Sequence, residues 1–479
     1  MTGPSVDVGR GLSAFVAAQS SFTLADAASE SYPEAVDAIR VITASAGGTI
    51  PVAPREDKFG TATAVPGILQ KRTAEGSLEG YVMPSGTVTT VSDIGADLLI
   101  KGGWEVVDRS ATNQTVLGSG SSTIKVDLGN STGFVAGDGV LVQTNDTATR
   151  YEARRIVAVD AGGTNIVVEP PLTFTPADGK NVQGAIAYKP SDTRDSTPDS
   201  LCLWLANNNS ADRISSWCPD SYSFTVGGED AARFTVSGTG KRHDRLFQTT
   251  LDGGINDAVT TIVVSNALAS AGDALNTYWL IEDEAVKVTA ISGTSWTVTR
   301  EVLSTTKDAH SDGVAIRPYR PTGTYAGSPV PSTSGQIVVS DGRGTTTAID
   351  LQCNSATLDC GFGTTYQEDV HGTTYKVAGY TMAQREVRAT LSGWTFRTTS
   401  MAAAMHAWDA TSISGSDSQQ VGMVVQTGTV VGSIFAWVAP RMRTEDVSLD
   451  RGAEEVTLDL TGLCEGTSSG ADEILLIFG

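Results

Sequence analysis

The sequence predicts a mainly β protein, and three observations support this. Glycine accounts for 51 of 479 residues, whereas charged residues make up 18 % and aromatic residues 6 %. Serine and threonine accompany glycine throughout, and short alternating segments recur between turn residues. Long amphipathic helical patterns are missing. At 479 residues the chain is too long for one ordinary core, so several domains are expected.

Net charge and cysteine content narrow the class of protein. The chain has 33 Lys and Arg against 54 Asp and Glu, a formal net charge of −21. A sequence-reading nucleic-acid binder would present a basic face, so this class is excluded. The N-terminal run GLSAFVAA lacks the basic segment of a secretory signal, and no stretch approaches the roughly 18 apolar residues of a membrane helix. Five cysteines without a Cys-x-x-Cys pair argue against a zinc site or disulfide framework and for buried thiols: Cys202, Cys218, Cys353, Cys360 and Cys464.

One pattern occurs twice. EARRIVAVDAGGTNIVV begins at Glu152, and EAVKVTAISGTSWTV begins at Glu284. A short β-branched strand and an identical Ala-Gly-Asp turn precede each, and a glycine turn, another strand and Asp-Gly follow. Five elements in the same order with nearly constant spacing indicate a duplicated unit. The shared turns lie at 136–138 and 271–273, and at 178–179 and 312–313.

Each unit has the features of a small β-module. Apolar and polar residues alternate with a period of two, which buries one face of each strand, and glycine supplies the turns. About 70 residues bury only a modest core, so such a unit is stable mainly when docked on a larger domain. We therefore predict two inserted β-modules, module A at 117–188 and module B at 250–318. The remaining ranges, 1–116, 189–249 and 319–479, are predicted to form the host.

The host repeats itself more weakly. SYSFTVGGEDAARFTVSGTG (221–240) matches AGYTMAQREVRATLSGW (378–394), and both are expected to be β-hairpins with one apolar face. This match suggests that 319–479 contains a second copy of the host fold.

Two short helices are expected within the host. The first begins with Ser92 as its N-cap and ends at Gly102. The second is an Ala-rich segment capped by Ser400.

No catalytic, cofactor-binding or metal site is predicted, and the chain is not expected to be an enzyme. GTSSG (466–470) matches the G-x-S-x-G consensus of a nucleophile elbow, but no histidine follows it and a strand pattern comes next. VSGTGKR (236–242) departs from a phosphate loop at its first glycine and its final Ser/Thr position. DGGIND (252–257) lacks the length and terminal Glu of a calcium loop. A paired-carboxylate glycosidase is left open. The histidines have no metal-ligand spacing: His243, His310, His371 and His406.

Three host segments resemble a known family. EGYVMPSGTV with DIGADLLIKGGWEVV, the 221–240 hairpin, and VVQTGTVVGSIFAWVAPRMRTEDVSLDRGAEEVTLDL with the ending ADEILLIFG are similar to tail tube (major tail) proteins of long-tailed bacteriophages. Modules A and B resemble the small β-domains that decorate phage tail and baseplate proteins. The motifs are loose, and the long chain with two insertions departs from the simplest members of the family.

The resemblance implies a fold, partners and a location. The fold would be a β-sandwich with a flanking helix, whose inner sheet joins those of its neighbours in a ring. Stacked rings would form a tube in the virion tail, which is assembled in the cytoplasm of the infected cell. The partners would be tape-measure, tail-terminator and tail-tip proteins, and no membrane would be involved. Residues 1–30 would be arms that order on assembly. Duplex DNA carries about one negative charge per 1.7 Å, so an acidic lumen would let it slide through.

Alternatives remain open at this level. A tail-tip or baseplate component is one, and a carbohydrate-binding adhesin is another. Exposed aromatic residues on the modules would favour the adhesin, although Trp296 alternates with Val298 and is expected in a core. A duplicated host would close a ring of six sandwiches with three chains, and a single sandwich would need six chains. The module aromatics are Phe134, Tyr151, Phe174, Tyr278, Trp279 and Trp296.

Overall fold

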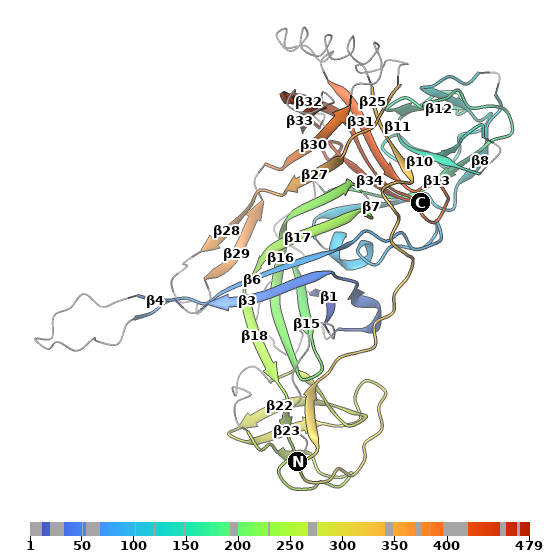
Figure 1. The fold of residues 1–479 in the computed structure, drawn as a ribbon. Coiled ribbons are helices and arrows are strands. Elements are labelled where there is room, and N and C mark those ends of the chain that lie inside the picture. Colours follow the sequence, from blue (N-terminus) through green and yellow to red (C-terminus); the bar gives the residue numbers. More distant parts are fainter. Residues whose placement is uncertain are drawn as a thin grey trace, which may run out of the picture.

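The computed structural model confirms a mainly β protein (Figure 1). It describes residues 12–19, 33–49, 51–53, 68–100, 102–118, 120–146, 149–191, 200–228, 230–266, 275–340, 348–368, 371, 376–382, 384–395, 420–450, 457–466 and 470–479. Helical structure in these ranges is limited to two short turns, the 3-10 turn η2 (Ala35–Asp37) and the π-helical turn η3 (Gly95–Leu99).

The first half of the host consists of two facing antiparallel sheets. One sheet has the spatial order β2, β1, β15, β16, β18, and we call it the covered sheet. The other, the open sheet, has the order β3, β6, β17, β16. The long strand β16 contributes to both sheets and bends at Ser216, whose φ is 53°. The strands are β1 (Ser13–Gln19), β2 (Ala38–Ile39), β3 (Thr43–Thr49), β6 (Thr73–Tyr81), β15 (Ser200–Ala206), β16 (Ser210–Gly227), β17 (Arg233–Gly240) and β18 (Arg242–Phe247).

The second half repeats this arrangement strand for strand. Its covered sheet has the order β26, β25, β31, β32, β34, and its open sheet has the order β27, β30, β33, β32. Here β32 is the strand that contributes to both sheets. The strands are β25 (Gly335–Ser340), β26 (Ala348–Leu351), β27 (Ser355–Gly361), β30 (Glu386–Thr395), β31 (Val421–Thr427), β32 (Phe435–Asp450), β33 (Thr457–Cys464) and β34 (Leu475–Phe478).

Each half also extends the hairpin that links the first two strands of its open sheet. The extension is β4 (Val52–Ala53) with β5 (Ile68–Leu69) in the first half, and β28 (Thr364–Glu368) with β29 (Val377–Met382) in the second.

The host is therefore duplicated. The sequence match between 221–240 and 378–394, however, aligns strands that are not equivalent. β16 pairs with β17, as expected of a hairpin. β29 pairs with β28, whereas β30 pairs with β27 and β33, so 378–394 is no hairpin. The counterpart of β17 is β33. Short alternating segments with glycine turns look alike, and alternation alone cannot show which strand pairs with which.

The two open sheets join into one. β16 pairs antiparallel with β27 from Ser221 opposite Gly361 to Gly227 opposite Ser355. The result is a continuous sheet with the order β3, β6, β17, β16, β27, β30, β33, β32, which runs through both halves (Figure 1). One hydrophobic core lies between this sheet and the two covered sheets, and it includes Leu78, Phe224 and Leu358 from the open side and Leu203 and Trp437 from the covered side.

Modules A and B are six-stranded sheets with the same topology. In chain order within each module, the spatial order of strands is first, sixth, third, fourth, fifth, second. Hydrogen bonds between the ends of the first and second strands close each sheet, through Leu117 and Asp127 in module A and Asp252 and Val263 in module B. Module A has β8 (Asn113–Thr115), β9 (Lys125–Asp127), β10 (Gly139–Gln143), β11 (Tyr151–Val159), β12 (Asn165–Glu169) and β13 (Asn181–Gly184). Module B has β19 (Thr249–Thr250), β20 (Thr261–Val263), β21 (Tyr278–Ile281), β22 (Glu284–Ser292), β23 (Ser295–Thr299) and β24 (Ala315–Pro318).

The repeated sequence of the two modules corresponds to the same local geometry. Both fourth strands carry a β-bulge at the same place, between Ile156 and Ala158 and between Val288 and Ala290. Of the two Ala-Gly-Asp turns, the first is held by the buried Asp138, whose carboxylate accepts from the Val135 N–H at 2.7 Å. The second, at 271–273, lies outside the described residues.

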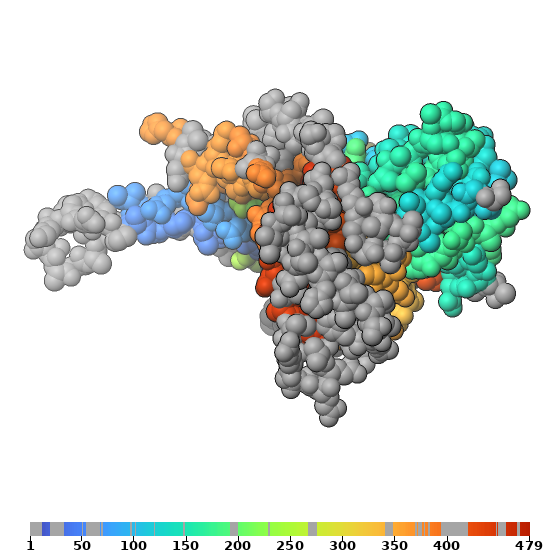
Figure 2. All heavy atoms as spheres, turned by 90° about the horizontal axis from the view of Figure 1, so that it is seen from above, coloured from blue at the N-terminus to red at the C-terminus, as the bar shows by residue number. Residues whose placement is uncertain are grey.

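The modules join the host at different points. Module A interrupts a hairpin, because β7 (Trp104–Asp108) and β14 (Ile186–Pro190) flank it and pair with each other. β14 also pairs with β34, so this hairpin extends the covered sheet of the second half, and the limit expected at 188 falls inside β14. Module B lies between the two halves, after β18 and before β25. Figure 2 shows module A as a lobe at one side of the molecule.

Each module covers the outward face of one covered sheet. Module A places Leu141, Tyr151 and Ala153 in a cluster with Val424 and Ile477 of the second half. Module B shares its core with the first half, where Phe15, Trp204 and Leu246 join Trp279 and Ile281. The covered sheets are therefore apolar on both faces, and β15, β31 and β34 are buried at every residue.

The expected helix at Ser92 is only a single π-helical turn. Ser92 is buried, and its hydroxyl has no hydrogen-bond partner, so it does not cap the turn. The Tyr222 hydroxyl instead lies 3.1 Å from the Leu98 carbonyl oxygen and 3.0 Å from that of Gly102, and this tertiary contact satisfies the end of the turn. The Ala-rich helix expected at Ser400 lies outside the described residues, as does most of 1–30.

We predict that module A can be removed if the face beneath it is made polar. Arg109 N lies 3.1 Å from Ala185 O, so an Asn-Gly turn can replace residues 110–184 and close the β7–β14 hairpin directly. The shortened chain should aggregate, because Val424, Val438 and Ile477 lose their cover. Changing these three residues to Thr in the shortened chain should restore a monodisperse, cooperatively melting protein, as followed by size-exclusion chromatography and circular dichroism. The insertion interpretation fails if the polar-faced chain still does not fold.

Candidate functional site

The solvent side of the open sheet is lined mainly by hydroxyl groups. Residues along its strands alternate between buried and accessible, as in β17, where Phe234, Val236 and Gly238 are buried and Thr235 and Ser237 face outward. We call the accessible side the hydroxyl face. Its Ser and Thr residues are Thr43, Ser45, Thr49, Thr73, Ser77, Ser221, Ser223, Thr225, Thr235, Ser237, Thr239, Ser355, Thr357, Thr390, Ser392, Ser448, Thr457 and Thr461.

Hydrogen bonds between strands order these hydroxyl groups. Ser45 and Ser77 oxygens are 2.7 Å apart, and those of Ser221 and Ser237 are 2.6 Å apart. At the junction between the two halves, the Ser223 hydroxyl donates to the Asp359 carboxylate at 2.6 Å. Cross-strand pairs of this kind stabilise a sheet and leave an even, hydrated surface.

The charges on the hydroxyl face are predominantly negative. Each arginine on it pairs with carboxylates: Arg233 with Glu79 and Asp230, Arg388 with Glu386 and Glu445, and Arg443 with Glu465. The hydrogen bond with Asp230 raises the pKa of Arg233, and that with Glu386 raises the pKa of Arg388. The outward carboxylates include Glu75, Glu79, Asp359, Glu386, Glu445, Asp446 and Asp459. A polyanion would find no unpaired cation among the arginines of this face.

Both outer edges of the open sheet lack a partner strand in the described part of the chain. At one edge β3 pairs only with β6. At the other, β32 from Arg443 to Asp450 pairs only with β33. Such edges present unpaired N–H and C=O groups, which are available to another strand.

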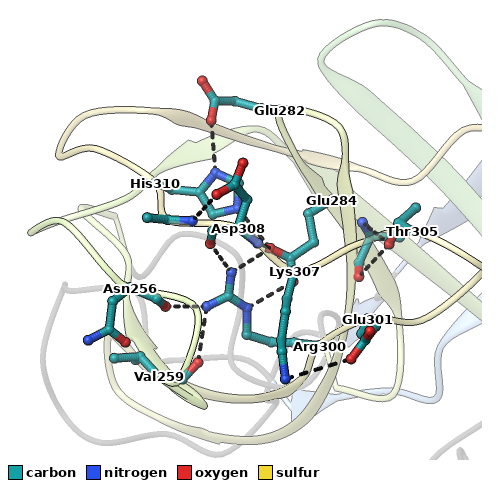
Figure 3. Close-up of polar contacts among 12 residues, drawn as sticks. Asn256, Val259, Glu282, Glu284, Arg300, Glu301, Thr305, Lys307, Asp308 and His310 are labelled. Atoms are coloured by element: carbon teal, nitrogen blue, oxygen red, sulfur yellow. Dashed lines mark hydrogen bonds and ion pairs between the residues drawn. The ribbon is translucent and has the colours of Figure 1, made fainter.

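A buried polar cluster organises module B (Figure 3). Glu284 begins β22 and is 1 % exposed, and its carboxylate accepts hydrogen bonds from Arg300 at 2.8 Å, from His310 at 2.8 Å and from the Asp308 N–H at 3.2 Å. The other ring nitrogen of His310 lies 2.8 Å from Glu282. The cluster thereby fixes the loop between β23 and β24.

The equivalent glutamate of module A also anchors the loop between the fifth and sixth strands. Glu152 is buried at the second residue of β11, where it accepts from Arg154 at 2.6 Å and from the Thr173 N–H at 3.1 Å. Thr173 lies between β12 and β13, in the loop that corresponds to Asp308 in module B. The repeated Glu-Ala pair of the sequence is thus a loop anchor, a role that sequence analysis did not assign. Its signal was the repetition of the dipeptide Glu-Ala at the start of the equivalent strand in both modules.

The other sequence candidates lie apart from one another. VSGTGKR forms the end of β17 and the start of β18, with strand geometry. His243 pairs with Asp212 at 2.8 Å, His371 is exposed, and His406 lies outside the described residues together with the centre of GTSSG. Cys353 is partly exposed, and the other four cysteines are buried free thiols, as expected.

The module aromatics are mostly internal. Trp279 and Trp296 are fully buried against each other, as expected for Trp296. Phe134 and Tyr151 are also buried, whereas Phe174 and Tyr278 are partly exposed. The modules therefore carry no broad aromatic platform among these six residues.

The described residues bring together no group of three or more His, Cys, Asp or Glu side chains that could hold a metal ion. Within the same ranges, every helical segment is too short to cross a membrane. A scan against protein-family models found no match, and a search of the curated proteins found none either.

We predict that the Glu284 anchor makes module B sensitive to acid. Burial alone would raise the pKa of Glu284, but the hydrogen bonds from Arg300, His310 and Asp308 outweigh it and lower the pKa from 4.5 to about 2. The contribution to stability is therefore complete above pH 4.5 and is lost as the pH falls toward 2. Glu284→Gln should cost about 3 kcal/mol of unfolding free energy at pH 7 and should flatten the acid dependence.

Urea unfolding of the two proteins between pH 7 and pH 3 measures this. The matched control is Glu301→Gln in the same module, because Glu301 is 57 % exposed and its partner Lys307 is 3.7 Å away. It should change stability by less than about 0.5 kcal/mol. Equal effects of the two variants would contradict the anchor role.

Proposed function

We propose that the protein forms rings that stack into a phage tail tube, a conduit for genome delivery. The observation that carries this proposal is the single open sheet, which has a hydroxyl-lined face and two unpaired edges. Copies that pair β3 with β32 of a neighbour would satisfy both edges and close a ring with the hydroxyl face inside. The resemblance to tail tube proteins points the same way.

The junction within one chain supplies the template for the junction between copies. β3 is the counterpart of β27, and the second part of β32 is the counterpart of the second part of β16. Both long strands carry a bulge at the same place, opposite Gly238 and Gly462. Following the pairings from there, Ser448 corresponds to Ser223 and Gly47 to Asp359. Because Ser223 lies opposite Asp359, Ser448 of one copy should lie opposite Gly47 of the next.

The duplication supports a ring of three chains. Each chain contributes two equivalent halves, so three chains supply six, the number of sandwiches in a ring of the family. The modules would lie outside the ring, since they cover the sheets on the side away from the hydroxyl face. Tape-measure, tail-terminator and tail-tip proteins would be the partners, the virion tail the location, and no catalysis is involved.

The chemistry of the hydroxyl face suits passage of DNA. Duplex DNA carries about one negative charge per 1.7 Å, and proteins that hold it neutralise phosphates with Lys and Arg. The arginines of this face are each paired with carboxylates, and hydroxyl groups hydrate well without attracting phosphate strongly. DNA would therefore slide along the face.

A disulfide between copies tests the proposed junction. Gly47→Cys with Ser448→Cys should crosslink under mild oxidation, because Ser448 is exposed and a Cβ at Gly47 meets no atom within 4 Å. Mass measurement under denaturing, non-reducing conditions should show dimers and closed trimers. The control Thr43→Cys with Ser448→Cys places the thiols four residues apart in register, about 13 Å, and should not crosslink. Crosslinked hexamers would overturn the three-chain ring, and no crosslinking in assembled material would overturn the junction.

Added positive charge tests the inner position of the hydroxyl face. Tubes that carry Thr235→Lys and Thr357→Lys should retain linear duplex DNA in a pelleting assay at low salt and release it as salt rises. Unchanged tubes should retain none. Thr297→Lys with Thr299→Lys, on exposed positions of module B, is the matched control. Equal retention by the control would contradict a hydroxyl face that lines the lumen. Rings that do not stack would favour the tail-tip component.

A further inference from the structure

A polar hollow lies between module A and the second half of the host. It has a volume of about 320 Å³, and we call it the junction pocket. Its lining comes from module A (Thr144, Asn145, Asp146, Arg150, Tyr151, Glu152, Thr173 and Phe174) and from the host (Gly335, Gln336, Asp350 and Thr429). The volume is at the lower end for small-molecule sites, which suits a ligand with one ring.

Hydrogen bonds hold the walls of the junction pocket in place. The Gln426 side chain donates to the Tyr151 carbonyl at 2.8 Å and accepts from the Ala153 N–H at 2.7 Å, which ties the module strand to β31. Asn145 donates to the Thr175 carbonyl at 2.8 Å and accepts from the Ala177 N–H at 2.9 Å. The pocket is therefore built before any ligand arrives.

Two polar atoms of the lining are buried without a hydrogen-bond partner, the Thr144 hydroxyl oxygen and the Gln336 amide nitrogen. An unpaired buried polar atom is costly, and a ligand that pairs with it recovers that cost. The amide nitrogen can only donate, whereas the hydroxyl can donate or accept. The ligand must therefore offer acceptors, and groups that both donate and accept suit it best.

The charges and rings of the pocket narrow the ligand further. Asp146, Glu152 and Asp350 disfavour an anion, and burial followed by the charge of Glu152 raises the pKa of Asp350. Two of the three carboxylates already face an arginine, Asp146 with Arg150 at 3.9 Å and Glu152 with Arg154 at 2.6 Å, which weakens the attraction of the pocket for a cation. Phe174, which is partly exposed, and the small accessible part of Tyr151 add apolar surface beside the polar groups. A neutral pyranose meets all of these conditions, since its hydroxyl groups donate and accept and its ring has an apolar C–H face.

We propose that the junction pocket binds a neutral hexose or N-acetylhexosamine at the end of a glycan. This inference does not rest on the tube, because one chain supplies every residue of the pocket. It gives module A a recognition role beside its cover of the sheet beneath.

Saturation-transfer NMR on the intact protein with the methyl glycosides of glucose, galactose, mannose, N-acetylglucosamine and N-acetylgalactosamine tests the proposal. At least one should show transfer and a measurable Kd. Thr144→Val and Gln336→Ala should each weaken binding about fivefold or more, the loss expected from one hydrogen bond. Thr225→Val, on the hydroxyl face, is the matched control and should leave the Kd unchanged.

Three results would overturn the proposal. The first is no transfer to any of the five glycosides. The second is an equal Kd for Thr144→Val, Gln336→Ala and the control. The third is competition by millimolar inorganic phosphate or Ca²⁺, which would identify an ion site instead of a sugar site.

Discussion

The pairing of β16 with β27 is the constraint on which the rest of the structure depends. It joins two equivalent halves edge to edge and converts two small open sheets into one with a single accessible face. It also occupies one edge of each half, so among the described strands of the open sheet β3 and the end of β32 are the two left with an unpaired edge. Because β27 and β3 are counterparts, the chain presents to a neighbour the same edges that it has already joined within itself. A repeated contact of this kind propagates into a ring or a helix.

The covered sheets impose a second requirement. Their strands are buried on both sides, as in SLCLWLA of β15 and VGMVVQT of β31, so the outward side needs a cover. The two halves solve this with modules of the same topology but attach them differently. Module A returns through β14 into the covered sheet itself, and module B merges its core with that of the first half. Neither module is an independent domain on a linker, because each covers apolar residues that the host would otherwise expose to water.

The buried glutamates explain why the dipeptide Glu-Ala is repeated in the two modules. A closed six-stranded sheet of this size has little core, and a long loop crosses from the fifth strand to the sixth. A carboxylate at the start of the fourth strand binds the backbone of that loop in both modules, at Thr173 and at Asp308. Burial of the charge is tolerated because an arginine and several N–H groups surround it. In module A this anchor also helps to shape the junction pocket, since Glu152 is part of the pocket lining.

The sequence by itself determined the fold class, the two modules and the alternation of the open sheet. Period-two patterns such as FTVSGTG encode a strand with one buried face, and the repeated turns encode a repeated unit, because both depend on residues close in the chain. It indicated a duplicated host but matched the wrong strands, since alternation does not specify partners. Tertiary structure alone decided that β17 corresponds to β33, that β16 meets β27 across 128 or more residues of chain, and that Ser92 leads only to a π-helical turn held by Tyr222. The hydroxyl face, the Glu284 cluster and the junction pocket likewise required it, because each gathers residues that are distant in sequence and whose contacts depend on strand register and on how the modules dock.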